Sequence, residues 1–261
     1  MSCTSRFIAL HEEAHVYLCA MGPEPCRSSL QHCIELLDPG EKQRLQRFVF
    51  AKDEHLYAVS HALVRTTLAR YTDVPAQAFR FVANSYGRPE IAYPSGLPPL
   101  RFNLSHTDGL CACVVTLASS GGIDVERMRP LDDLLQLAQS SFSPCEYLAL
   151  RAAPPAEQAE LFYFYWTLKE AYVKARGMGL SLPLSEFAIR RGVNGKIEFS
   201  SKDAQEPASG WQFFHRRVSL FHQLAVALPR GSRPIKRVTV RWTDTPGGDG
   251  GEDLDEHLSG F

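Results

Sequence analysis

The most informative stretch of the 261-residue sequence is Phe162-Tyr163-Phe164-Tyr165-Trp166-Thr167-Leu168-Lys169-Glu170-Ala171-Tyr172-Val173-Lys174. We predict that it lies in a long helix that spans about 156–176. On a helix, Trp166, Glu170 and Lys174 are each four residues apart and share one face. Because the neighbouring residues are so aromatic, we expect this face to be partly buried, and a partly buried carboxylate needs a partner. That partner is either a metal ion or Lys174; an ordinary surface ion pair beside a core aromatic has the same spacing.

A second segment, 121–126, has the period of two that is typical of a β-strand. This period sends Asp124 and Glu126 to one side of the strand, and the apolar residues Ile123 and Val125 to the other. Two neighbouring carboxylates repel each other unless a cation lies between them. The segment therefore indicates either a cation site or, more simply, the end of a strand with two solvated acids.

A third segment, Arg101-Phe102-Asn103-Leu104-Ser105-His106-Thr107-Asp108-Gly109, is predicted to form a strand over 101–104 and a polar turn over 105–109. Such a turn would present Ser105 and His106. It could bind a phosphate through a hydroxyl, an imidazole and backbone N–H groups. The alternative is that the histidine in the turn has a structural role.

The remaining patterns place these segments in two similar halves. Asp38-Pro39-Gly40-Glu41 and Ser143-Pro144-Cys145-Glu146 both have the form of a capping box at a helix start. Each is followed by a longer helix, over 53–71 and about 156–176. Strands are then expected at 79–83, 101–104, 110–117, 187–190, 196–200, 211–218 and 223–228. This order predicts an α+β fold with two pseudo-two-fold-related subdomains, each a long helix packed on a small, mostly antiparallel sheet.

We divide the chain into an N-terminal subdomain over 1–118, a C-terminal subdomain over 119–244 and a disordered acidic tail over 245–261. The net charge of −1 argues against a general nucleic-acid binder. The longest apolar run, 110–118, is shorter than the roughly 18 residues that span a bilayer. The N-terminal residues lack the pattern of an export signal. Seven scattered cysteines fit a reducing, cytoplasmic setting better than a disulfide framework.

Together and in this order, these segments resemble the Sfp-type 4′-phosphopantetheinyl transferases. The matching stretches are 86–89, 102–106, 122–126, 166–174 and 177–184, and the resemblance covers residues 38–228. It implies a monomeric enzyme whose site lies at the junction of the two halves. It also implies the reaction: with Mg²⁺, the 4′-phosphopantetheine arm of coenzyme A moves to a serine of an acyl, peptidyl or aryl carrier protein, and adenosine 3′,5′-bisphosphate is released.

The resemblance also implies roles for particular residues. The expected ligands of Mg²⁺ are Asp124, Glu126 and Glu170, and oxygen ligands suit this ion. The catalytic residues would be Glu170 and Lys174, and either Glu170 or a metal-linked water would take the serine proton. The expected contacts of coenzyme A are Lys42, Arg44, Arg88, Ser105, His106 and Lys174. The sequence departs from the family at Glu41, which stands at a position where relatives have lysine.

Two other functions are compatible with parts of the sequence. The run His11-Glu12-Glu13-Ala14-His15 matches the H-E-x-x-H pattern of zinc hydrolases, with His11 and His15 as ligands and Glu12 as the base. This pattern requires a helix, whereas 15–20 favours a strand. The other alternative is a non-catalytic module that binds carrier proteins, which would not need the three acids. The sequence does not identify the acceptor carrier.

Overall fold

The computed structural model describes residues 3–22, 27–192, 195–203, 207–231, 234–243, 246 and 256–258. Its helices are α1 (Cys3–Ala9), α2 (Arg27–Leu36), α3 (Pro39–Leu45), α4 (Ala51–Ala69), α5 (Leu134–Ser141), α6 (Pro144–Ala152) and α7 (Pro155–Arg176). Its strands are β1 (Glu13–Ala20), β2 (Arg80–Ala83), β3 (Pro89–Tyr93), β4 (Leu100–Thr107), β5 (Leu110–Leu117), β6 (Gly122–Arg127), β7 (Phe187–Arg191), β8 (Ile197–Ser201), β9 (Trp211–Arg217), β10 (His222–Pro229), β11 (Arg237–Thr243) and β12 (Glu256–Leu258).

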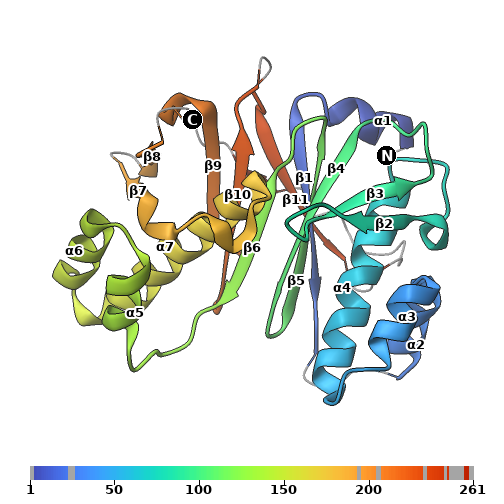
Figure 1. Ribbon diagram of the computed structural model, residues 1–261, viewed down its shortest axis with the longest axis horizontal. Coiled ribbons are helices and arrows are strands. Elements are labelled where there is room, and N and C mark those ends of the chain that lie inside the picture. The colour runs from blue at the N-terminus through green and yellow to red at the C-terminus, as the bar shows by residue number, and fades with distance from the viewer. Residues whose placement is uncertain are drawn as a thin grey trace.

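Two sheets meet in the middle of the molecule, and one long helix covers the outer side of each (Figure 1). The five-stranded sheet has the order β12-β11-β1-β5-β4 and packs against α4. The three-stranded sheet has the order β6-β10-β9 and packs against α7. Two further two-stranded ribbons are β2–β3 and β7–β8. The predicted α+β fold, with a long helix on a small sheet in each half, is confirmed.

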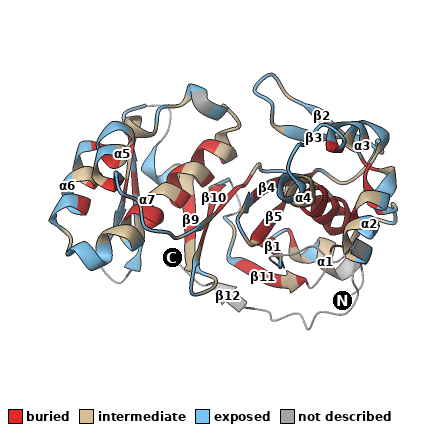
Figure 2. Ribbon diagram, turned by 90° about the horizontal axis from the view of Figure 1, so that it is seen from below, coloured by how far each residue is buried: buried red, intermediate tan, exposed pale blue. Residues whose placement is uncertain are grey.

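The apolar core has three parts, one under each long helix and one between the two sheets. Figure 2 shows the buried residues along the long helices and the inner strands. Ile123 and Val125 of β6 are fully buried in the part between the sheets. Since side chains alternate along a strand, Asp124 and Glu126 point the other way, toward α7. The orientation predicted for this segment is therefore confirmed.

Local signals explain where the helices beside the site begin and end. Both predicted capping boxes form: the N-cap residues Asp38 and Ser143 exchange hydrogen bonds with Glu41 and Glu146 at the starts of α3 and α6. Helix α7 ends at Gly177, which has the left-handed conformation with φ of 64°. Glycine adopts this conformation without the penalty that a Cβ atom adds.

One strand crosses from the second half of the chain to the first. β11 pairs in parallel with β1, from Glu13 opposite Arg237 to Cys19 opposite Thr243. This pairing joins residues assigned to the C-terminal subdomain to the N-terminal sheet, and the division at 118/119 stays a prediction. Within the tail over 245–261, β12 pairs with β11. Apart from Pro246, the other tail residues lie outside the described part of the structure.

No helix in the described ranges combines the length and the apolar character needed to cross a bilayer. Cys111 and Cys113 are free, buried residues of β5, and they act as small core side chains.

Candidate active site

A close contact between β6 and α7 brings the two acidic segments together. A Cβ atom at Gly122 would lie 2.0 Å from the carbonyl oxygen of Ala171 and 2.4 Å from the backbone nitrogen of Ala175. Only glycine allows the helix backbone to pass this close to the strand. The contact lies two residues before Asp124, so the face of α7 that carries Glu170 and Lys174 reaches the acids of β6.

Asp124 is the buried centre of the cleft between β6 and α7, with an exposed fraction of 3%. Its Oδ1 atom accepts hydrogen bonds from Lys174 Nζ at 2.6 Å and from Ser105 Oγ at 2.9 Å. Its Oδ2 atom is buried and has no hydrogen-bond partner among the described residues. An unpaired buried carboxylate oxygen is costly, and a bound cation would remove this cost.

The other two acids lie in the field of Asp124. Burial, followed by the charge of Asp124, raises the pKa of Glu126 to about 7. The indole N–H of Trp166 and the hydroxyl of Thr107 donate to Glu126 and partly oppose this rise. Burial and the charge of Asp124 also raise the pKa of Glu170. The three acids thus crowd one another, which is the situation that a divalent cation relieves.

The residues fit a hard cation such as Mg²⁺, although the described side chains hold no ready-made group of three metal ligands. Lys174 pairs with Asp124 and supplies part of the positive charge that the acids need. Mg²⁺ commonly takes only one or two carboxylates from the protein and completes its shell with water and substrate phosphates. An open arrangement of Asp124, Glu126 and Glu170 suits this kind of binding better than a closed cage would.

The turn predicted at 105–109 forms only at Asp108 and Gly109. β4 continues to Thr107 and pairs with β5, with Ser105 opposite Ala112 and His106 opposite Cys111. The backbone here belongs to the sheet ladder and cannot cradle a phosphate. Ser105 is buried and bonds to Asp124, whereas His106 points to the opposite side and reaches solvent. Partial burial and the charge of Lys174 lower the pKa of His106.

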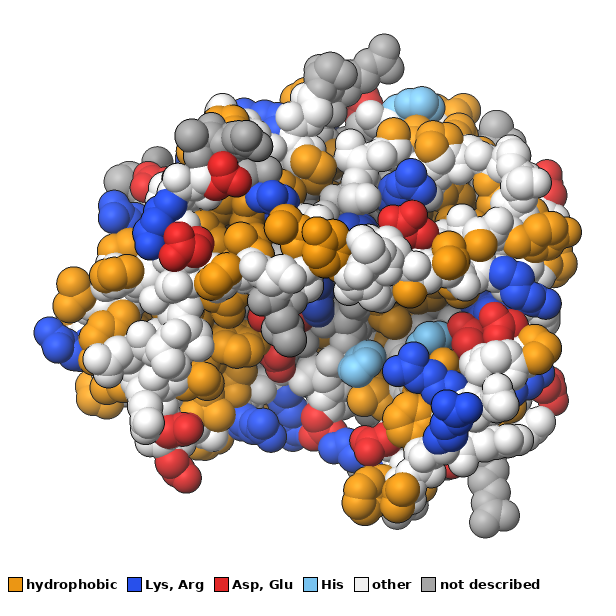
Figure 3. All heavy atoms as spheres, viewed as in Figure 1, with side chains coloured by type: hydrophobic (Ala, Val, Ile, Leu, Met, Phe, Trp, Pro, Cys, Tyr) orange, Lys and Arg blue, Asp and Glu red, His pale blue; other side chains and the backbone are white. Residues whose placement is uncertain are grey.

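Two cavities flank the acids and share Thr107, Asp108 and Arg127. One has a volume of about 820 Å³ and carries basic groups and imidazoles: Lys52, His55, His106 and Arg127. The other has a volume of about 630 Å³ and is mainly apolar, with Met128, Leu131, Leu137, Phe162, Trp166 and Phe221. Figure 3 shows histidine and basic side chains at a hollow between the two halves.

Comparisons with known proteins show the family of the chain. The family described as the 4′-phosphopantetheinyl transferase superfamily matches residues 120–229, and the family described as 4′-phosphopantetheinyl transferase, N-terminal, matches residues 23–120. A 4′-phosphopantetheinyl transferase of Bacillus subtilis is 34% identical over 64% of this chain and 72% of that protein. This chain belongs to the 4′-phosphopantetheinyl transferases.

Two further transferases match about two thirds of this chain. The transferase Sfp of Bacillus subtilis (strain 168) is 32% identical over 67% of this chain and 75% of that protein. HetI of Nostoc sp. is 35% identical over 66% of this chain and 72% of that protein. A solved holo-(acyl-carrier-protein) synthase of Bacillus anthracis is 16% identical, with a TM-score of 0.36, over 42% of this chain and 94% of that chain.

In this phosphopantetheinyl transferase, Arg88 holds the two halves together. Its Nη1 donates to the carbonyls of Lys174 and Ala175, both at 3.0 Å, in the last turn of α7. Its Nη2 donates to the carbonyls of Gly121 at 3.1 Å and Phe102 at 3.4 Å. A contact between these two nitrogens and coenzyme A would require the bonds to break. These bonds give Arg88 a structural role, and its contact with coenzyme A stays a prediction.

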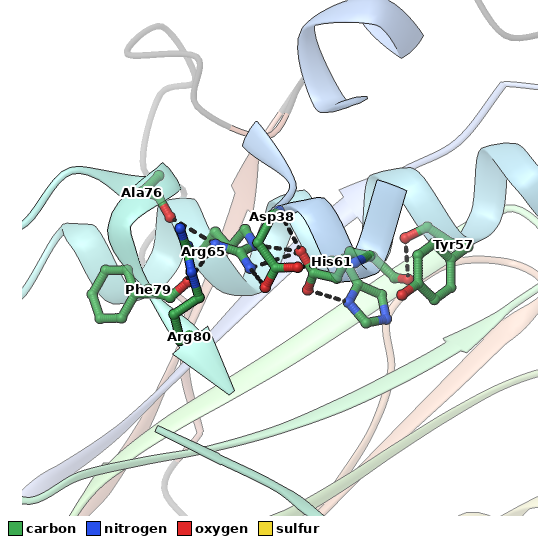
Figure 4. A network of polar contacts seen from close by, with 9 residues as sticks. Asp38, Tyr57, His61, Arg65, Ala76, Phe79 and Arg80 are labelled. Carbon is green, nitrogen blue, oxygen red and sulfur yellow. Dashed lines mark hydrogen bonds and ion pairs between the residues drawn. The ribbon is translucent and has the colours of Figure 1, made fainter. Parts of the chain in front are cut away.

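The departure from the family at Glu41 has a structural explanation (Figure 4). The side chain of Arg65 is fully buried and forms ion pairs with Asp38 at 2.8 Å and Glu41 at 2.7 Å. It also donates to the carbonyls of Ala76 and Phe79. Glu41 accepts a further hydrogen bond from His61 at 2.8 Å. Its carboxylate thus neutralises a buried arginine and fixes α3 to α4, where a lysine could not do so.

Lys42 and Arg44 lie on α3, apart from the residues that line the two cavities beside the acids. Arg44 is exposed and stacks over the ring of Tyr57, which in turn stacks on His61. It lines a separate open cavity with Gly40, Gln43, Arg47 and Phe48. Contacts of these two residues with coenzyme A stay a prediction.

The H-E-x-x-H pattern does not form the helix that a zinc hydrolase of this type requires. His11 and Glu12 lie in a turn, and His15 lies in β1, as the β-favouring sequence predicted. Both ring nitrogens of His15 are engaged, with Tyr71 at 2.6 Å and Glu13 at 3.1 Å. This buried histidine is a structural residue of the sheet.

Several residues of the transferase site were missed from the sequence. Thr107 and Trp166 bond to Glu126, and His55 lines the basic cavity. A strand predicted to continue to Thr107 would have identified this residue, because the period of two places Ser105 and Thr107 on one side of β4. His55 lies on α4, and no motif in the sequence around it indicates a link to the site.

Proposed function

We propose that this protein transfers the 4′-phosphopantetheine arm of coenzyme A to a serine of a carrier protein, in the cleft between β6 and α7. The observation that carries the proposal is the buried, unpaired Oδ2 atom of Asp124 among the described residues, with two further acids beside it. Membership in the transferase family supports the same activity. Asp124, Glu126 and Glu170 would hold Mg²⁺, which neutralises charge on the pyrophosphate of coenzyme A.

The reaction is a phosphoryl-type transfer that depends mainly on alignment and charge. The serine oxygen forms a bond to the β-phosphorus, and the bond to the bridging oxygen of the α-phosphate breaks. The leaving group is adenosine 3′,5′-bisphosphate. Lys174 would stabilise the charge that develops on the phosphate oxygens. Either Glu170 or a metal-linked water would accept the serine proton.

The two cavities suit the two ends of coenzyme A. The basic cavity, with Lys52, His106 and Arg127, offers the charge that a phosphorylated nucleotide needs. The apolar cavity beside Glu126 and Trp166 offers a surface for the uncharged pantetheine arm or for the carrier helix next to the serine. Arg44 and Lys42 would add to the basic surface at the 3′-phosphate.

All of the proposed catalytic residues belong to one chain, so a monomer would be sufficient for activity. We propose a cytoplasmic monomer that acts on acyl, peptidyl or aryl carriers. No part of the site requires a membrane or a nucleic acid.

The proposal is tested by incubating the protein with coenzyme A, Mg²⁺ and a panel of apo carrier proteins. Intact mass spectrometry should show the gain of one phosphopantetheine group on at least one carrier, and chelation of Mg²⁺ should abolish it. Binding of coenzyme A without a mass gain on any carrier would instead indicate a non-catalytic binding module. Stoichiometric zinc in the purified protein, with hydrolysis of peptides, would revive the zinc alternative.

A further inference from the structure

The two sheets lie next to each other along one edge strand of each sheet. β4 is the last strand of the five-stranded sheet and β6 is the last strand of the three-stranded sheet, and the two lie alongside each other. The main chain of β4 pairs with β5, and that of β6 pairs with β10. On an edge strand of an antiparallel sheet, alternate N–H groups point away from the neighbouring strand. Half of the N–H groups of β6 therefore point toward β4.

Side chains of β4 accept these N–H groups. Three alternate residues of β4 each accept a hydrogen bond from an alternate residue of β6: Asn103 Oδ1 from Ile123 N at 2.9 Å, Ser105 Oγ from Val125 N at 3.2 Å, and Thr107 Oγ1 from Arg127 N at 3.2 Å. We call Asn103, Ser105 and Thr107 the β4 side-chain ladder. It replaces the main-chain ladder that would otherwise join the two strands.

The two hydroxyl groups of the β4 side-chain ladder also form hydrogen bonds with the acids of β6. Ser105 donates to Asp124 at 2.9 Å, and Thr107 donates to Glu126 at 3.4 Å. Each hydroxyl thus accepts from the main chain of β6 and donates to a carboxylate of the same strand. A slip of β6 by one residue would exchange its two faces and turn the acids toward the apolar core. Three bonds at a constant spacing prevent such a slip.

We propose that Asn103 and Thr107 are positioning residues: they hold β6 in the register that places Asp124 and Glu126 opposite Glu170. The consequence for metal binding and catalysis rests on the proposed function, whereas the hydrogen bonds themselves do not. The residues act through β6 and not by contact with the reacting atoms. Their loss therefore weakens cation binding and slows the transfer step, because β6 is no longer held in this register.

Thr107 offers a matched pair of variants. Thr107→Val keeps the shape of the side chain and removes the hydroxyl, and Thr107→Ser keeps the hydroxyl and removes the methyl group. We expect the amide of Arg127 to exchange its hydrogen about tenfold faster in Thr107→Val, as measured by NMR, since a protecting hydrogen bond is lost. Thr107→Ser should exchange at the wild-type rate, and the β10 amides should not change. Equal exchange at Arg127 in all three proteins would overturn the proposal.

The positioning role is tested by Mn²⁺ binding, followed by electron paramagnetic resonance, and by steady-state kinetics. Thr107→Val should bind Mn²⁺ about fivefold to tenfold more weakly and lower kcat by a similar factor, and Thr107→Ser should restore both. A purely structural role predicts a lower Tm with wild-type Mn²⁺ affinity and kcat, and this result would overturn the proposal.

Asn103→Ala provides a second variant, with faster exchange expected at the Ile123 amide and the same fall in Mn²⁺ affinity and kcat. If this buried substitution prevents folding, the Thr107 pair still decides the question. If wild-type protein binds no Mn²⁺ and modifies no carrier, the proposed function fails, and the amide exchange still tests the ladder separately.

Discussion

The ammonium group of Lys174 lies 2.6 Å from Oδ1 of Asp124, across the seam between α7 and β6. The pair joins the helical motif to the acidic strand, which are separated by 50 residues in the sequence. Lys174 contacts only the Oδ1 atom of this carboxylate, because it lies on the side of Asp124 that faces Ser105. Its ammonium group also donates a hydrogen bond to Ser105. The ion pair thus orients Asp124 and leaves its second oxygen for another cation.

Replacement of Lys174 by methionine should lower both activity and stability. We expect kcat to fall about 100-fold, because the charge on the transferred phosphate loses its stabilising group. Without Mg²⁺, the Tm should fall by a few degrees, because the buried Asp124 loses its partner. Added Mg²⁺ should remove most of the difference in Tm. Thermal unfolding with and without Mg²⁺ measures this, with Lys202→Met as the exposed control; a Tm deficit that Mg²⁺ does not change would contradict the expectation.

Arg88→Ala should destabilise the fold at the junction of the halves. Four carbonyl groups lose a charged donor, so we expect a loss of about 2–3 kcal/mol in the free energy of unfolding. Denaturant unfolding measures this loss, with the exposed Arg47→Ala as the control. An unchanged stability together with a raised KM for coenzyme A would instead support the phosphate contact that the sequence predicted.

Two buried histidines should make the protein less stable as the pH drops below about 6.5, whereas Glu126, whose pKa is raised to about 7, acts in the opposite direction. Burial lowers the pKa of both His15 and His215 to about 4 in the folded state. Unfolded histidine has a pKa of about 6.5, so the unfolded chain binds more protons between these values. Their stabilising effect is present above about pH 6.5 and is lost on acidification, with a slope of roughly 3 kcal/mol per pH unit for the two together.

The two histidines together cause part of the slope of the unfolding free energy against pH. His215→Gln should reduce this part by about half between pH 4.5 and 6.5. The exposed His32→Gln serves as the control and should leave it unchanged. Denaturant unfolding at several pH values between 4.5 and 6.5 measures the slope. A slope in His215→Gln equal to that of the wild type would show that another group controls the acid transition.

Lys169, next to Glu170 in the helical motif, should be essential for folding and not for chemistry. It forms a fully buried ion pair with Glu146 at 2.8 Å and donates to the carbonyls of Leu184 and Phe187. Lys169→Met leaves the carboxylate unpaired, and we expect a loss of about 3–5 kcal/mol in the free energy of unfolding. The double variant with Glu146→Gln should recover part of it. A stable Lys169→Met protein with low activity would point to a catalytic role.

The parts of the site that depend on local periodicity were predictable from the sequence. The spacing of Trp166, Glu170 and Lys174, and the alternation around Asp124, each follow from the geometry of one element. That the helical motif and the acidic strand lie together was predicted only from the family resemblance. The physical cause is Gly122, which lets the backbone of α7 pass close to β6. A glycine before an acidic strand does not reveal by itself which helix will pack on it.

Features that depend on distant partners were not predictable in the same way. β11 was missed because its pairing with β1 joins residues at opposite ends of the chain. The extension of β4 to Thr107 was missed because Ser105, His106 and Thr107 are polar and have the composition of a turn. Their polarity is explained by β6, whose N–H groups and acids they bond. The role of Arg88 likewise depends on carbonyl groups from distant segments.

The most direct test of the account is whether the strand acid and the helix acid bind the same ion. Mn²⁺ affinity should be measured in the wild type, Asp124→Asn, Glu170→Gln and the double variant. We predict that each single change weakens binding strongly, and that the double change weakens it little more than the worse single change. Wild-type affinity in Glu170→Gln, or effects that simply add, would contradict a shared site.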